Sequence, residues 1–222
     1  MHRWIGGPGD PDKADPAFRF GPFYALEVED RYQLLNDNLL DLTHLAYLHG
    51  SSIGVEGNAS APEQREEFDN LLKSRREMKN VPMMGSHEGR FDYDGPVDRL
   101  SGMDFYLSGF HAGFDEMSIP QDHATRGGEK LTVHHVFHAV TPAKLNSCNY
   151  FFGMGGVMND EDFAHAKIYL APVIEEDAMA TREIEEMLGT LGYYPDELML
   201  KSDASAVQAR RKLQAMMDRE RA

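Results

Sequence analysis

RYQLLNDNLLDLTHLAYLHG occupies residues 31–50 and carries the pattern on which the predicted fold and site depend. Its leucines recur at the spacing of one helical face, and Gly50 is a suitable stop, so the stretch predicts an amphipathic helix. The leucines that form this face are Leu34, Leu35, Leu39, Leu42, Leu45 and Leu48.

The polar residues of this stretch are spaced so that several of them share one side. Asn38, Asp41 and His44 follow one another at intervals of three, which places them on adjacent helical turns. His44 and His49 are five residues apart, and in a regular α-helix that spacing separates them by about 140° around the axis. If both bind one metal ion, the helix must end, loosen or bulge between them.

Two histidines in this arrangement indicate a particular kind of metal site. The His-x-x-x-His spacing of zinc peptidases, with its adjacent Glu, is absent. Two imidazoles and one carboxylate form the facial triad of non-haem Fe(II) oxygenases, which leaves positions open for O2 and substrate. The third ligand would be distant in sequence, and spacing alone does not choose it among 37 acidic residues. The alternative interpretation is a set of surface or hydrogen-bonded core residues.

The chain around this helix reads mostly as strands. A strand is predicted at 23–30, after an extended lead-in at 1–17 that is rich in Gly, Pro and Asp. Residues 51–70 are polar and predict a loop, and residues 71–158 are largely strand-like. The best strand segments are 99–110, 129–142 and 147–157, with hairpin turns at 125–130 and 141–146.

Helical patterns return toward the end of the sequence. Asn159 or Asp160 is suited to cap a long helix, which Pro172 would interrupt or kink. A final charged helix is predicted within residues 195–221. This order of elements predicts a single α+β domain over residues 1–222, with an antiparallel sheet and helices packed on one side.

Composition and charge exclude several classes of function. The chain has 222 residues, 41% of them apolar and 27% charged, which is typical of a globular domain. A net charge of −15 argues against nucleic acid and against anionic membrane surfaces as partners. No stretch resembles a signal peptide or approaches the ~18 apolar residues of a membrane span. A single cysteine, Cys148, permits no internal disulfide, so a cytoplasmic protein is expected.

The segment DNLLDLTHLAYLH, residues 37–49, resembles the iron-binding segment of Rieske non-haem iron oxygenases of the vanillate O-demethylase and phthalate dioxygenase branch. That family's pattern is Asn-x-x-Asp-x-x-His-x-x-x-x-His, and each specified residue is present. Three further stretches are similar to the same branch. Residues 4–16 resemble the connection that follows the Rieske domain, 138–153 a late strand pair, and 173–185 the helix that brings a carboxylate ligand.

The resemblance implies a fold and a set of site residues. The fold is the helix-grip domain, a curved antiparallel sheet wrapped around a long helix and enclosing a pocket. His44, His49 and Asp177 would be the metal ligands; the alternative for Asp177 is a solvated helix face among glutamates. Asp41 would link an iron-binding histidine to the Rieske site of a neighbouring subunit, and Asn38 would lie near the iron.

The resemblance also implies a chemistry and partners. The function would be O-demethylation or hydroxylation of an aromatic compound with mononuclear Fe(II) and O2. Electrons would arrive from a reductase through a Rieske [2Fe–2S] cluster, so the partner would be a Rieske domain or a ferredoxin or reductase. The full-length family would form a homotrimer. Such a cluster needs two Cys and two His, and this chain has only Cys148. The Rieske domain is therefore expected to be missing, as in a fragment, a truncated gene product or one half of a split enzyme.

A substrate-binding residue is predicted on the strand around 131–140. Alternation along this strand places His138 on one face with Thr132, His134, Val136 and Val140. There its imidazole could orient a carboxylate or a phenolic oxygen of a substrate. The alternative is a hydrogen-bonded core histidine.

Two functions of other classes remain open. The chain could be a non-catalytic helix-grip module that binds a small molecule in its pocket. It could also be a hydrolytic enzyme with zinc in the same triad. Metal analysis distinguishes the zinc enzyme from the iron enzyme, and turnover with an added electron donor distinguishes the binding module.

Overall fold

The computed structural model describes residues 17–107, 109–192 and 196–221. These residues form seven strands, four α-helices and three short 3-10 helices. The strands are β1 (Phe18–Val28), β2 (Glu63–Glu67), β3 (Leu71–Val81), β4 (Val97–Tyr106), β5 (Phe110–Ser118), β6 (Lys130–Lys144) and β7 (Ser147–Val157). The helices are α2 (Tyr32–Leu40), η2 (His44–Ala46), α3 (Glu56–Ser60), η3 (Gly85–His87), α4 (Asp160–Leu191), η4 (Lys201–Asp203) and α5 (Ala204–Arg221).

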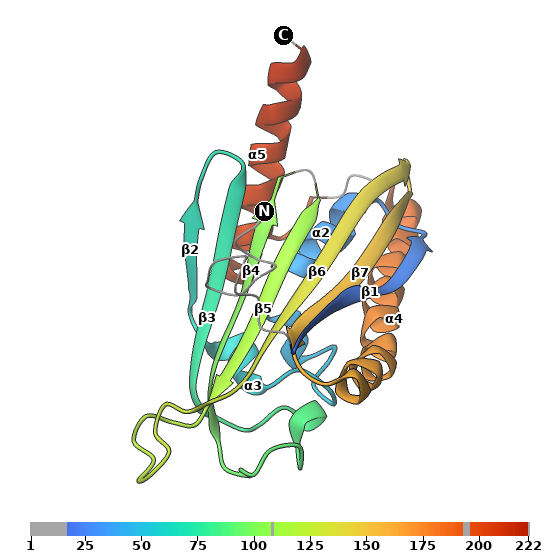
Figure 1. Ribbon diagram of the computed structural model, residues 1–222. Coiled ribbons are helices and arrows are strands. Elements are labelled where there is room, and N and C mark those ends of the chain that lie inside the picture. The colour runs from blue at the N-terminus through green and yellow to red at the C-terminus, as the bar shows by residue number, and fades with distance from the viewer. Residues whose placement is uncertain (1–16, 108, 193–195, 222) are drawn as a thin grey trace.

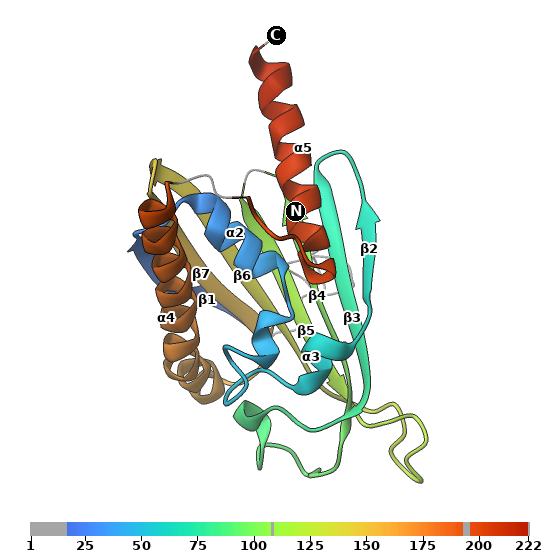
Figure 2. The same ribbon diagram turned by 180° about the vertical axis from the view of Figure 1, so that it is seen from behind.

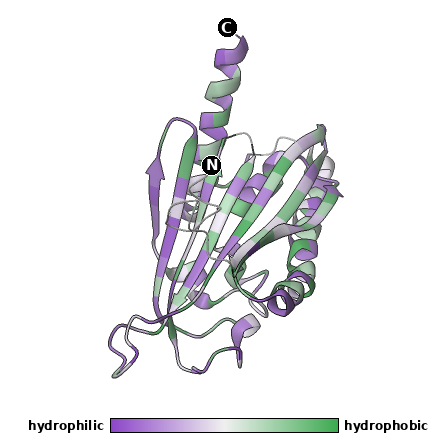
Figure 3. Ribbon diagram, viewed as in Figure 1, coloured by the Kyte–Doolittle hydropathy of each residue, from purple (hydrophilic) through white to green (hydrophobic). Residues whose placement is uncertain are grey.

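The strands form one antiparallel sheet in the order β1-β7-β6-β5-β4-β3-β2. Figure 1 shows the sheet as a curved layer, and Figure 2 shows α2, α3, α4 and α5 together on its other side. The predicted α+β class is confirmed, and a long helix held on one face of a curved antiparallel sheet is the helix-grip arrangement. The edge strand β2, EQREE, is hydrophilic along its length (Figure 3), which discourages pairing with another sheet.

Helix α4 begins where its sequence predicts. The Asn159 side chain accepts a hydrogen bond from the Asp162 amide at 2.8 Å and caps the first turn. Pro172 does not interrupt the helix, which continues through it to Leu191. Gly192 then ends the helix with a φ of 94°, a conformation that glycine adopts without strain. The buried face of α4 includes Ile174, which packs in the core between the helix and the sheet.

This core joins the two helices that carry the candidate site to the strands beneath them. Leu35 and Leu39 of α2 pack with Tyr150 and Phe152 of β7, and all four side chains are buried. Burial of apolar side chains of this size contributes about 1.5–3 kcal/mol each. The core therefore fixes α2 and α4 against the sheet.

The predicted helix over 31–50 is wrong in its second half. Helix α2 ends at Leu40, and Asp41 leaves the helical conformation with φ −90° and ψ 85°. The Asp41 carboxylate accepts hydrogen bonds from the amide and the hydroxyl of Thr43, at 3.0 and 2.7 Å. These local hydrogen bonds to the Asp41 side chain compete with continuation of the helix. The leucine spacing continued past the point where the helix stops.

Two other expectations are corrected. The predicted loop at 51–70 contains α3 and β2. The predicted strand at 99–110 covers most of β4, and its last residue, Phe110, is the first residue of β5. Between them Gly109 has a φ of 104°, and a Cβ there would lie 2.2 Å from the Val140 carbonyl oxygen, so only glycine fits this turn. The lead-in at 1–17 lies outside the described residues except for Ala17.

None of the helices that the structure describes is long and apolar enough to pass through a membrane.

Candidate metal centre

His44 lies in η2, directly after the end of α2. Its Nδ1 is 2.5 Å from the Asp41 carbonyl oxygen, which can only accept, so Nδ1 carries the proton and donates. The other nitrogen, Nε2, is then left with its lone pair, and it lies 3.5 Å from Asp177 Oδ1. The early end of α2 thus sets both the tautomer and the direction of this imidazole.

His49 follows in the turn after η2 and is completely buried. Its carbonyl oxygen accepts the amides of Ser52, Ile53 and Gly54, which holds the turn in place. Nδ1 lies 2.7 Å from Glu176 Oε2 and donates to it, and Nε2 lies 3.0 Å from Asp177 Oδ1. The two histidines therefore reach the same carboxylate although a regular helix would have turned them apart.

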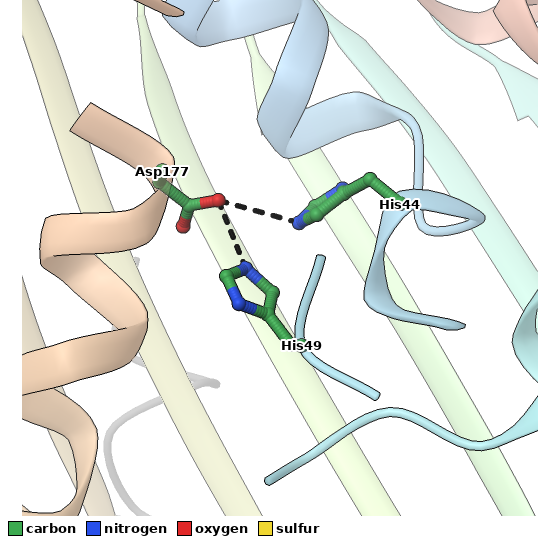
Figure 4. Close-up of side chains that lie close together, drawn as sticks. All are labelled: His44, His49 and Asp177. Carbon is green, nitrogen blue, oxygen red and sulfur yellow. Dashed lines mark hydrogen bonds and ion pairs between the residues drawn. The ribbon is translucent and has the colours of Figure 1, made fainter. Parts of the chain in front are cut away.

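Asp177 comes from the buried face of α4 and is 4% exposed. Figure 4 shows its Oδ1 directed at both imidazoles. The same oxygen accepts a hydrogen bond from Asn38 Nδ2 at 2.8 Å, so Asn38 orients the carboxylate. A solvated helix face, the alternative for Asp177, does not describe this side chain.

The protonation of this cluster follows from its contacts. Burial alone would lower the pKa of His49, but the hydrogen bonds and charges of Asp177 and Glu176 outweigh it and raise that pKa. Burial alone would raise the pKa of Asp177, but the His49 hydrogen bond and the charges of both histidines lower it. The carboxylate is therefore ionised at neutral pH.

The donor set fits a facial-triad metal ion. The ligating atoms of His44, His49 and Asp177 all lie within 4.8 Å of one another. Adjacent ligands at about 2.0–2.2 Å from one ion are separated by about 3 Å when their bonds are perpendicular. Each imidazole offers Nε2 while its Nδ1–H is bound to an oxygen, which is the usual second partner of a metal-bound histidine.

Asp41 does not join this cluster through its carboxylate, which is bound to Thr43. It acts on the site through its carbonyl oxygen, the partner of His44 Nδ1. The carboxylate is only partly buried, and the neighbouring Tyr47 is 79% exposed. Asp41 therefore stands between the candidate metal ligand and the surface.

A cavity of about 310 Å³ lies next to the triad and includes its three residues in its lining. This volume is at the lower end of the range for small-molecule sites. Apolar side chains make up much of the wall, including Phe152, Met154 and Ile174. The predicted strand face is confirmed in part: Thr132, His134, Val136 and His138 line the cavity, and Val140 is in the core.

His138 is 7% exposed, and its Nδ1 lies 2.7 Å from the Tyr150 hydroxyl. Tyr150 has no other hydrogen-bond partner among the described residues, so its hydroxyl is assigned as the donor to Nδ1. Nε2 then carries the imidazole proton and is a hydrogen-bond donor at the cavity. Burial lowers the pKa of His138 to about 4, which keeps the ring neutral.

Sequence reasoning missed several residues of the site. Glu176 binds His49 but stood out only as one glutamate among many. Tyr150 alternates inward on β7, and that alternation could have identified it. His87 and Arg90 reach the cavity from the connection between β3 and β4, and no sequence pattern links that connection to the triad.

The family described as "Vanillate O-demethylase oxygenase C-terminal domain" matches residues 28–219. A vanillate O-demethylase oxygenase subunit of Pseudomonas sp. is 30% identical over 99% of this chain and 72% of that protein. A toluene-4-sulfonate monooxygenase system iron-sulfur subunit of Comamonas testosteroni is 26% identical over 91% of this chain and 62% of its own length. The chain thus spans roughly two thirds of these relatives.

Solved structures agree on the fold. Dicamba monooxygenase bound to 3,6-dichlorosalicylic acid superposes with a TM-score of 0.78 at 22% identity, over 97% of this chain and 67% of that one. Dicamba monooxygenase with non-heme iron and dicamba gives a TM-score of 0.67 at 21% identity, over 97% and 66%.

Proposed function

The chain belongs to the family of vanillate O-demethylase oxygenase C-terminal domains, and from that premise we propose that it oxidises an aromatic compound, by O-demethylation or hydroxylation, as the catalytic domain of a Rieske-type oxygenase. The observation that carries the proposal is the convergence of His44, His49 and Asp177 beside a largely apolar cavity. An open-sided metal site next to a largely apolar pocket is what such a reaction requires.

We propose that the two imidazoles and the carboxylate hold one Fe(II). When bound, ferrous iron supplies the one-electron chemistry by which O2 is reduced. The residues around the triad set its shape: Asn38 holds the Asp177 carboxylate, and Glu176 holds the His49 ring. Contacts of this kind typically change metal affinity by about 10–100-fold when they are removed.

The cavity would bind the substrate and exclude water from it. Apolar walls favour an aromatic ring, because burying apolar surface gains about 25 cal/mol per Å². His138, held as an Nε2–H donor by Tyr150, would bind an oxygen of the substrate. The imidazole is neutral, so it would orient the substrate without adding a charge.

For O-demethylation the reaction balances as ArOCH3 + O2 + 2 H⁺ + 2 e⁻ → ArOH + CH2O + H2O. The two electrons need a donor, and one cysteine cannot supply the ligands of a Rieske cluster. We propose that a Rieske domain, or a ferredoxin or reductase as the electron donor, delivers them. Asp41 would stand at that junction, within a trimer of the family type.

Turnover with and without a cluster tests this function. The iron-loaded chain, given methoxylated benzoates with NADH and a reductase, is expected to form little product. Hydrogen peroxide carries both oxygen and the two electrons, so formaldehyde is expected with peroxide. Strong NADH-coupled turnover by the chain alone would contradict the need for an external cluster. Absence of formaldehyde from every methoxylated substrate under peroxide would favour the binding-module alternative.

A further inference from the structure

A buried arginine on the sheet contacts the turn that carries His49. Arg99 lies on β4 and is 3% exposed. Its Nη1 donates to the carbonyl oxygen of Ile53 at 3.1 Å and to Asn58 Oδ1 at 3.3 Å. The same guanidinium binds both carboxylate oxygens of Asp115 on β5, at 2.6–3.0 Å. One side chain thus joins two strands of the sheet to the segment that follows the second histidine of the triad.

The turn that begins at His49 is built around the carbonyl oxygen of this residue. That oxygen accepts the amides of Ser52, Ile53 and Gly54 at 3.0, 3.1 and 2.9 Å. The peptide group between Ile53 and Gly54 therefore donates to it through its N–H. The carbonyl oxygen of this same peptide group is the one that binds Arg99. Hydrogen bonds linked in this way polarise and strengthen one another, so the sheet is coupled directly to the backbone of the histidine.

The same turn packs closely against η2, which carries His44. A Cβ on Gly54 would lie 1.7 Å from the Leu45 carbonyl oxygen, so only glycine allows the two segments to approach this closely. Helix α3 lies beside η2 (Figure 2). Its residue Asn58, through the oxygen that binds the guanidinium, also accepts the Val55 amide at 2.9 Å. A shift of the turn would therefore displace η2, and with it the second imidazole.

Arg99 has no role in the proposed reaction, although it lines the cavity. Its Nε, Nη1 and Nη2 are all bonded to protein oxygens. Arginine presents five donors in a rigid planar fork, so it can hold a carboxylate, a backbone carbonyl and a side-chain amide in fixed directions at once. Lysine carries the same charge as a single point on a flexible stem and cannot replace the fork.

We propose that Arg99 is a positioning residue of the metal centre: through the Ile53 carbonyl it fixes the turn that aims His49 at the triad carboxylate. The inference rests on the proposed function, which places a metal ion at the triad. A purely electrostatic role would have the opposite sign. A positive charge near a cation weakens its binding, so removing that charge would strengthen it. The positioning role predicts that loss of the fork weakens binding.

Two variants remove the fork in different ways. Arg99→Lys keeps the charge and loses the planar donors. Arg99→Met combined with Asp115→Leu replaces the buried ion pair by apolar side chains of similar size, a change that is often neutral for stability.

Arg76→Met is the matched control. Arg76 is also a buried arginine, 4% exposed, and lies on the neighbouring strand β3. It binds the carbonyl oxygen of Ala61, which caps the far end of α3, and so anchors the same helix without touching the turn after His49.

Iron affinity and amide exchange are measured on the same preparations. Competition with a chelator under anaerobic conditions gives the Fe(II) affinity. It is expected to fall about tenfold in both Arg99 variants, as for groups that orient metal ligands, and to stay unchanged in Arg76→Met. Hydrogen exchange of the iron-free chains is expected to become faster at the amides of residues 52–54 in the Arg99 variants and not in the control. Circular dichroism and melting temperature verify that each variant is folded.

Unchanged or tighter iron binding in a folded Arg99 variant overturns the inference, and so does an equal loss in Arg76→Met. Weaker binding without faster exchange overturns it too, because Arg99 then does not act through the turn. Failure of both Arg99 variants to fold beside a folded control also overturns it, because Arg99 then serves the fold as a whole.

A wild-type chain that binds no iron counts against the proposed oxygenase, and exchange alone then decides the inference. Faster exchange at residues 52–54 confined to the Arg99 variants would support the positioning of His49. Equal exchange in all chains would overturn it.

Discussion

Replacing His87 by Phe should make the free energy of unfolding fall less as the pH is lowered. The His87 imidazole is largely buried and held neutral, with a pKa lowered to about 3 from an ordinary value of 6.5. A histidine whose folded pKa is depressed stabilises the fold fully above pH 6.5. That contribution is lost as the pH falls from 6.5 toward 3, because the unfolded chain takes up a proton that the folded chain does not.

The magnitude follows from the two pKa values. At pH 7 the unfolded imidazole is mostly neutral, so folded and unfolded states bind nearly the same number of protons. At pH 5 the unfolded imidazole is about 97% protonated while the folded one is neutral, which costs about 2 kcal/mol of unfolding free energy at 1.36 kcal/mol per pH unit. Phenylalanine keeps the ring against Phe91 and removes the proton site.

Urea denaturation at pH 7 and pH 5 measures this difference. From pH 7 to pH 5 the urea midpoint of the wild type is expected to fall by about 1 M more than the midpoint of His87→Phe. This value assumes that the unfolding free energy changes by about 2 kcal/mol per M urea. Met84→Leu is the control, because Met84 is a buried residue of the same cavity with no proton site. Equal pH dependence in wild type and His87→Phe would show that His87 is not held neutral by burial.

The remaining predictions concern the triad and the substrate. His138→Ala should weaken binding of methoxylated benzoates in calorimetry and leave iron content unchanged; unchanged affinity for every ligand that binds would return His138 to a core role. Tyr150→Phe should weaken the same ligands, by about 0.5–1.5 kcal/mol, because the His138 ring loses the hydrogen bond that fixes its tautomer. Asn38→Leu should lower iron affinity about 10–100-fold by releasing the Asp177 carboxylate, and an unaltered iron titration would refute that role.

The elements that the sequence predicts best are those with local signals. The alternation over Thr132–Val140 and the hairpin turn before β7 predicted two neighbouring strands of the sheet. The Asn159 cap predicted the start of α4 because a cap acts through backbone groups within one turn. Such signals need no knowledge of the partner elements.

The predicted helix over 31–50 was wrong where Asp41, which is not part of the leucine pattern, determines the backbone conformation. Leu42, Leu45 and Leu48 continue the helical spacing, yet the Asp41–Thr43 hydrogen bonds end α2 before them. At 51–70 the polar composition indicated a loop. Exposed edge strands such as β2 are polar on both faces and carry no alternation.

The candidate site was predictable only through the motif and its family resemblance. Spacing alone did not place the two histidines at one site, and it did not identify the carboxylate ligand among 37 acidic residues. The sheet brings α4 and the turn after α2 together, which places Asp177 3.0 Å from His49 across 128 residues of sequence. The contact between the His87 and His134 rings depends on the same long-range packing, because the two residues lie on separate elements.

Iron content after anaerobic reconstitution tests the central claim most directly. The wild-type chain is expected to bind one iron per chain, and His44→Ala, His49→Ala and Asp177→Ala are each expected to bind none, since two remaining ligands rarely retain Fe(II). Two matched controls should keep the iron: Glu175→Ala, an exposed acid two residues from Asp177, and Asp41→Asn, whose backbone carbonyl still binds His44. Stoichiometric iron in His49→Ala or Asp177→Ala, or its loss in Asp41→Asn, would contradict the assignment of the triad.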